Sequence, residues 1–214
     1  MCIRDSVTSV RNLCRELEKK GHAVRILTLS ESVHSYREGN VTYVRSLPLD
    51  AVYPNVRMAT TLHHRLIREL IDWQPDVIHS QCEFFTFQFA LYVSKHTGAP
   101  IVHTYHSLYE QYVTYVLPSK RLGKTLVRVL SKKRLRRVKA VIAPTEKVGD
   151  ALRAYGLRND IRIVPSLSLI HIYRPLYHVD RRQASTPAAY VKGCFAVQQG
   201  ISLPLFIQGQ NSGA

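Results

Sequence analysis

Short apolar runs alternate with helical patterns along residues 10–164, and this alternation limits the folds open to the chain. The patterns predict helices at 10–17, 58–73, 85–96, 119–139 and 146–155, and strands at 23–29, 41–47, 77–78, 101–104, 141–142 and 161–164. Such spacing favours a doubly wound, mostly parallel α/β sheet with helices on both faces. Ligands of these sheets bind at the carboxyl ends of strands, so the residues just after each strand are the candidates for a site.

The first element of the alternation is missing from the sequence pattern. Residues 10–29 read as a helix followed by a strand, which is half of a βαβ unit. Residues 1–7 carry neither a strand run nor a glycine-rich turn. We therefore expect the sheet to lack its first strand.

Both ends of the chain depart from the pattern. Residues 167–214 show no stable period, so we expect an irregular tail. The peptides MCIRDS and SLSLIHI also resemble translated sequencing-adapter DNA. The hypothesis is that residues 1–6 and 167–214 are not native and that 7–166 form the folded domain; a genuine but irregular tail is the alternative.

The charge balance points to anionic partners. Thirty Lys and Arg stand against fifteen Asp and Glu, a formal net charge of +15. No helix-turn-helix, RNA-binding signature or zinc finger accompanies this charge, which argues against nucleic acid. No apolar run is long enough for a spanning helix, and the four cysteines have neither metal-ligand nor disulfide spacing, so a reducing, cytosolic setting fits best.

Residues 120–139 concentrate the positive charge, with ten Lys or Arg and no acid. An apolar stripe is expected to bury one face of this helix, formed by Leu122, Leu126, Val129, Leu130 and Val138. The opposite face is expected to contact anionic lipid through Lys120, Arg121, Lys124, Arg128, Lys132, Lys133, Arg134, Arg136 and Arg137. The alternative is a solvated basic face over an ordinary core helix.

Polar side chains follow two strands that we expect to be neighbours. His106 comes just after the strand at 101–104, and Glu110 lies four residues later. His79 and Glu83 follow the strand at 77–78, so the two strand ends should face one crevice. The candidate contacts in these segments are His79, Glu83, Tyr105, His106, Tyr109 and Glu110. The alternative is that the histidines are core or capping residues.

A metal site is not predicted in this crevice. His79, Cys82 and His106 are potential zinc ligands, but no paired Cys or His motif with ligand spacing accompanies them.

Four segments resemble the amino-terminal half of glycosyltransferase family 4 enzymes of the GT-B fold, especially bacterial diacylglycerol glucosyltransferases. They are VTSVRNLCRELEKKGHAVRILT, PDVIHSQCEF, HTYHSLYEQY and VIAPTEKVGDAL. The resemblance covers residues 7–166 and implies a Rossmann-like acceptor-binding domain. In that family a second domain binds the nucleotide sugar, and transfer takes place between the two domains.

The resemblance implies a retaining transfer of glucose from UDP-glucose to a diacylglycerol-type lipid. It implies no metal or other cofactor, with the UDP-sugar as co-substrate, and a peripheral position on the cytoplasmic face of the cell membrane. By resemblance, His106 contacts the donor sugar near the reacting carbon, His79 and Glu83 line the acceptor side, and Lys147 lies at the cleft rim. Developing charge in such a transfer calls for oriented dipoles and cations more than for a strong base.

Two other functions remain open at this point. One is a family 4 enzyme with a soluble sugar or phosphatidylinositol as acceptor, and the other is a non-catalytic anion-binding module. Because the sequence shows neither the glycine-rich turn nor a donor-binding domain, we expect the 214-residue chain alone not to turn over.

Overall fold

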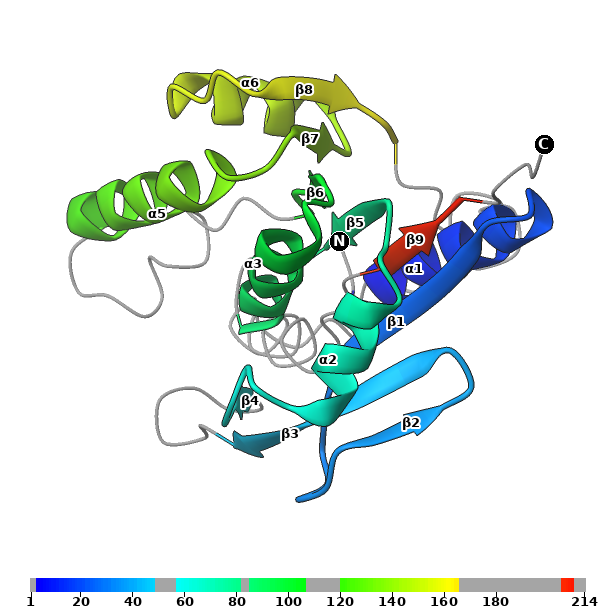
Figure 1. Ribbon diagram of the computed structural model, residues 1–214. Helices are drawn as coiled ribbons and strands as arrows, with labels where there is room; N and C mark the ends of the chain where they lie inside the picture. The colour runs from blue at the N-terminus through cyan, green and yellow to red at the C-terminus, as the bar shows by residue number, and fades with distance from the viewer. Residues whose placement is uncertain (1–2, 49–56, 82–84, 107–119, 166–204, 210–214) are drawn as a thin grey trace, which may run out of the picture.

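A sheet of mostly parallel strands with flanking helices organises the residues described by the computed structural model, which are 3–48, 57–81, 85–106, 120–165 and 205–209 (Figure 1). The helices are α1 (Ile3–Lys19), α2 (Arg65–Asp72), α3 (Phe85–Thr97), α5 (Lys120–Leu135) and α6 (Glu146–Ala154). The strands are β1 (Ala23–Ser30), β2 (Tyr36–Glu38), β3 (Val41–Pro48), β4 (Arg57–Ala59), β5 (Val77–Ser80), β6 (Ile101–Thr104), β7 (Ala140–Ala143), β8 (Asp160–Ile163) and β9 (Leu205–Gln208).

The strand order is β2-β3-β1-β9-β5-β6-β7-β8, and β4 pairs with the far end of β3. Strands β3 and β1 are parallel, as are β5, β6, β7 and β8. Strand β9 is antiparallel to both β1 and β5, so these two strands run in the same direction. The predicted doubly wound, mostly parallel α/β sheet is confirmed.

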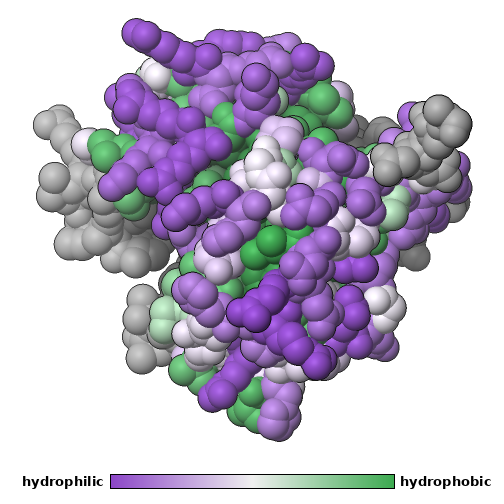
Figure 2. Space-filling view, viewed as in Figure 1, coloured by the Kyte–Doolittle hydropathy of each residue, from purple (hydrophilic) through white to green (hydrophobic). Residues whose placement is uncertain are grey.

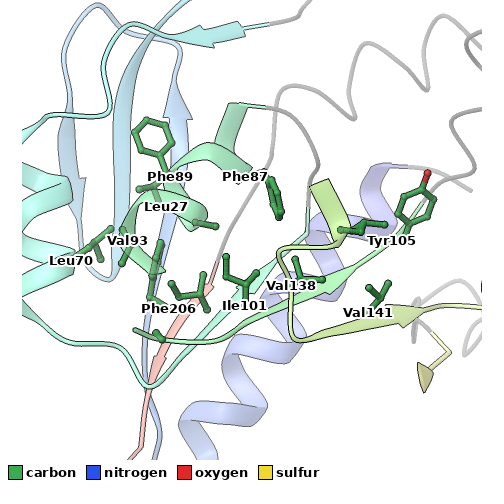
Figure 3. Packing of buried hydrophobic residues seen from close by; sticks show 14 of the residues in the cluster. Leu27, Leu70, Phe87, Phe89, Val93, Ile101, Tyr105, Val138, Val141 and Phe206 are labelled. Carbon is green, nitrogen blue, oxygen red and sulfur yellow. The ribbon is translucent and has the colours of Figure 1, made fainter. Parts of the chain in front are cut away.

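Alternating side chains of β1 divide the core between the two faces of the sheet. Val24 and Ile26 pack against Val10 of α1 on one face. Leu27 and Leu29 point to the other face, into the larger cluster that also contains α2 and α3 (Figure 3). Burying each of these aliphatic side chains contributes about 1.5–3 kcal/mol, so the strand holds helices on both sides.

The expectation of an irregular tail fails at residues 205–208. Leu205 and Phe206 are both 0% exposed, on opposite faces of the sheet. Among the described residues no strand precedes α1, and β9 lies between β1 and β5. Pairing there satisfies the backbone groups of two buried strand edges that would otherwise lack partners, which is costly inside a sheet.

The helix predicted from residue 58 begins later, at Arg65, and residues 57–59 form β4 instead. Arg57 fixes this strand because its Nε donates to Ser46 Oγ at 2.7 Å and its Nη2 donates to Ser46 O at 3.1 Å. His64 then caps the helix, since its Nδ1 accepts from the Leu66 amide at 3.2 Å. A cap at His64 excludes the preceding residues from α2.

Candidate functional site

Two hydrogen bonds join the carboxyl ends of β5 and β6. His79 Nε2 lies 2.7 Å from Thr104 Oγ1, and His106 Nε2 lies 2.9 Å from Gln81 Oε1. Because the Gln81 oxygen only accepts, Nε2 of His106 carries the hydrogen in this pair. The parallel register, with His79 beside Val102, places both imidazoles at one edge of the sheet, as the sequence predicted.

Strand alternation separates the residues of the HTYH segment. Thr104 bonds to His79 on one face, whereas His103 points to the opposite face, where its ring lies edge-on to Phe87 at 5.6 Å. Tyr105 is 0% exposed and its hydroxyl lies 3.3 Å from Ser131 Oγ of α5. Tyr105 is therefore a core residue that joins β6 to α5, and its predicted substrate contact is wrong.

Burial keeps His79 neutral. Loss of hydration is the largest effect, followed by the charges of His103 and His106, and together they lower the pKa of His79 from 6.5 to about 3. The side chain is only 8% exposed, compared with 9% for His106. At neutral pH, His79 acts as a hydrogen-bonding partner that fixes the strand end, with no charge of its own.

Several predicted contacts lie outside the described part of the chain. They are Glu83, Tyr109 and Glu110, together with Cys82 and the side chains of Lys120, Arg121 and Lys124. The roles proposed for them stay predictions.

Lys147 lies exposed in the first turn of α6, after the carboxyl end of β7. Thr145 begins this helix, since its Oγ1 accepts from the Val148 amide at 3.3 Å. Because β5, β6 and β7 are parallel neighbours, Lys147 belongs to the same edge of the sheet as His79 and His106.

The buried face of the basic helix α5 differs from the prediction at Val129 and Leu130, whereas the side chains of Leu122 and Leu126 lie outside the described part of the chain. Val127, Ser131 and Leu135 are buried at four-residue intervals, whereas Val129 and Leu130 are 56% and 42% exposed. Val138, after the helix, is buried as predicted. The prediction is wrong for Val129 and Leu130 because α5 carries apolar residues on two sides, and the contact with Tyr105 and the sheet buries only one side.

The described cations of α5 fall into two groups. Arg128 turns toward α6, where Nη2 donates to Ala154 O at 2.9 Å and the guanidinium lies 5.6 Å from the Tyr155 ring. Arg128 is itself exposed, so its predicted membrane contact stays a prediction beside this contact within the protein. Lys133, Arg136 and Arg137 are exposed.

Lys133, Arg134 and Arg137 line a cavity of about 220 Å³ between α3 and α5, together with Leu91 and Leu130. In the view of Figure 2, hydrophilic residues dominate this side of the molecule and apolar residues interrupt them. Charge and exposed apolar surface thus occur together on α5.

None of the helices in the described residues has the length and hydropathy needed to cross a membrane. The described ranges also contain no group of three or more His, Cys, Asp or Glu side chains that is placed to hold a metal ion.

Thr104 and Gln81 are the site residues that the sequence reading left out of its candidates. Each is hydrogen-bonded to one of the two histidines; Thr104 is the last residue of β6, and Gln81 directly follows β5. Their position at the end of a parallel strand was the available signal, but the partner of each depends on strand register and rotamer.

Comparison with known proteins gives one family and several relatives. The model of Glycosyltransferase Family 4 matches residues 6–166. The chain is 32% identical over 170 residues to an alpha-monoglucosyldiacylglycerol synthase of Streptococcus pneumoniae, covering 78% of the chain and 38% of the relative. It is 28% identical over 190 residues to the Acholeplasma laidlawii protein of the same name, covering 83% and 46%.

A more distant relative is a sulfoquinovosyl transferase of Arabidopsis thaliana, 30% identical over 104 residues, with 48% of the chain and 20% of the relative covered. The chain thus spans less than half the length of these relatives. No solved structure gives a significant match.

Proposed function

This chain belongs to glycosyltransferase family 4, and we propose that it is the acceptor-binding domain of a retaining enzyme that transfers a glucosyl group from UDP-glucose to a diacylglycerol-type lipid. Two relatives are named as alpha-monoglucosyldiacylglycerol synthases, which supports a lipid acceptor. The observation that carries the proposal is that His79 and His106 lie together at the carboxyl ends of adjacent parallel strands, where α/β sheets bind ligands.

In the proposed reaction, the bond between glucose C1 and the UDP oxygen breaks, and a bond from C1 to the lipid hydroxyl oxygen forms. UDP leaves and the hydroxyl proton is released. His106 is proposed to contact the sugar near C1, with Gln81 fixing its ring through the 2.9 Å hydrogen bond. A pre-oriented ring stabilises developing charge without reorganising during the reaction.

The neutral His79 and Glu83 are proposed to bind the acceptor, with Lys147 at the rim of the cleft. The ring of His79 is held at 2.7 Å from Thr104, so it presents a fixed surface to the lipid headgroup. No metal or other cofactor enters the proposal, in which the nucleotide sugar is a co-substrate.

The proposal is tested by product formation in the enzyme that carries this domain. With radiolabelled UDP-glucose and diacylglycerol in mixed micelles, we expect a glucolipid with the anomeric configuration of the donor. The 214-residue chain, assayed beside it, is expected to give no product. Transfer only to a soluble sugar or to phosphatidylinositol would overturn diacylglycerol as the acceptor, and absence of any transfer would favour a binding module.

We further propose that α5 holds the domain on an anionic surface at the inner face of the cell membrane. Val129 and Leu130 are exposed apolar residues next to the exposed cations Lys133 and Arg137. A lipid surface accepts both kinds of side chain at once, with about 1 kcal/mol expected for each basic residue near the headgroups. This arrangement would bring the domain to an acceptor that stays in the bilayer.

Vesicle flotation tests this surface with two matched double variants. We expect the chain to float with vesicles containing phosphatidylglycerol, and Lys133→Gln with Arg137→Gln to lower its partition coefficient about tenfold, since two such residues contribute about 2 kcal/mol at most. The control, Arg11→Gln with Arg15→Gln, removes two exposed charges from α1. Equal losses in both variants, or binding indifferent to anionic lipid, would contradict the proposal.

A further inference from the structure

A second cationic feature lies at the edge of the sheet opposite to His79 and His106. It is a cavity of about 620 Å³ lined by Lys132, Arg136, Gly156, Leu157, Arg158 and Asn159. Helix α5 ends shortly before β7, and Asn159 directly precedes β8. The cavity therefore borders the amino ends of two parallel strands, whereas His79 lies near the carboxyl end of β5 and His106 follows the carboxyl end of β6.

The cavity gathers positive charge without neutralising it. Its cations are Lys132, Arg136 and Arg158, and no carboxylate is among its lining residues. Within the described ranges, none of the three forms an ion pair with an acidic side chain. The nearby Asp160 is already paired with Arg162 at 2.8 Å. Three cations around one cavity repel one another, so an anion between them would be stabilising.

Capping of helix ends does not account for these cations. Two helices end at the cavity, and cations often compensate their free carbonyl groups. Here Asn159 Nδ2 already donates to the carbonyls of Leu135 at 3.0 Å and Val138 at 2.7 Å. The Gly156 amide donates to Arg153 O at 2.8 Å. With these carbonyls occupied by protein donors, the three basic side chains remain available to a ligand.

The backbone shapes the cavity for Lys132. Gly156 has φ +75°, and a Cβ added there would lie 2.8 Å from Lys132 Nζ. Glycine thus serves two purposes, ending α6 in the left-handed region and leaving room for the ammonium group. The ammonium group of Lys132 thus lies directly over this turn, at the side of the cavity.

We propose that this cavity binds a phosphate-class anion, either a free phosphate or diphosphate group or the headgroup of a phosphate-bearing lipid. Arginine donates in a planar fork that matches phosphate oxygens, and lysine adds a compact charge. A volume of about 620 Å³ is large enough for a group bigger than inorganic phosphate. The site is separate from the proposed transfer site and stands whether or not that proposal holds.

The test is calorimetric titration of the 214-residue chain with inorganic pyrophosphate, followed by flotation with vesicles containing phosphatidic acid. We expect Arg136→Gln with Arg158→Gln to weaken binding at least about tenfold, because each lost charge-assisted contact is strong. The control is Arg11→Gln with Arg15→Gln on α1, and circular dichroism checks that both variants are folded.

The two arms identify the source of the anion. Saturable pyrophosphate binding that the cavity variant loses and the control keeps supports a soluble ligand. A loss confined to the vesicle arm supports a lipid headgroup. If the cavity variant and the control behave alike in both arms, the proposal is overturned.

Discussion

Replacing His106 with alanine in the enzyme that carries this domain should lower kcat for glucolipid formation by about 10²–10³-fold, the range seen when one pre-oriented polar contact to a transition state is removed. His106 is 9% exposed and its ring is hydrogen-bonded to Gln81, so the ring is held in one orientation, and the truncated side chain of alanine cannot make the same contact. Because His106 is proposed to act on the donor sugar, KM for the lipid acceptor should change little. Initial rates at varied acceptor concentration provide the measurement.

His96→Ala is the matched control for this variant. His96 is an exposed histidine in the last turn of α3, with Nδ1 bonded to Tyr92 O at 2.8 Å. Its loss should leave kcat unchanged, and thermal unfolding should show that both variants fold. A His106→Ala enzyme that keeps most of its turnover would support a non-catalytic binding role for this strand end.

The position of His106 at the carboxyl end of β6, at the same edge of the sheet as His79, was predictable because it follows from the parallel order of the strands. The run 101–104 is short, begins with the β-branched apolar residues Ile101 and Val102 and is preceded by Pro100, and it forms β6 with the expected limits. Parallel strands bring their carboxyl ends to one edge, so His79 and His106 had to meet there. The partners Thr104 and Gln81 follow from register and rotamers, which local patterns do not contain.

Other parts of the fold depend on contacts distant in sequence. Helix α5 has apolar residues on two sides, and both sets show helical spacing. Packing against the sheet buries Val127 and Leu135 and leaves Leu130 exposed. Strand β2 has three residues, all exposed, and therefore no alternation to detect. Strand β9 lies in a segment whose sequence shows no helix or strand periodicity. Its four residues form a strand by pairing with the backbone edges of β1 and β5.

Strand β9 also permits a test of the sheet itself: Phe206→Ala should lower the free energy of unfolding of the 214-residue chain by about 3–5 kcal/mol. Phe206 is 0% exposed and belongs to the same cluster as Val93 and Ile101 (Figure 3). Truncation removes buried apolar surface and leaves a cavity in the middle of the sheet, where neighbouring strands cannot close together. Urea unfolding followed by circular dichroism measures the change.

Two control variants are needed to interpret a small effect of Phe206→Ala on the free energy of unfolding. Leu27→Ala removes a fully buried side chain from the adjacent β1 and should cost about 2–5 kcal/mol whichever segment lies beside it. Val33→Ala, at a position that is 61% exposed, should stay within about 0.5 kcal/mol of the parent chain. If Leu27→Ala is costly while Phe206→Ala resembles Val33→Ala, residues 205–208 do not occupy the slot between β1 and β5. The tail would then be irregular throughout, as its sequence suggests.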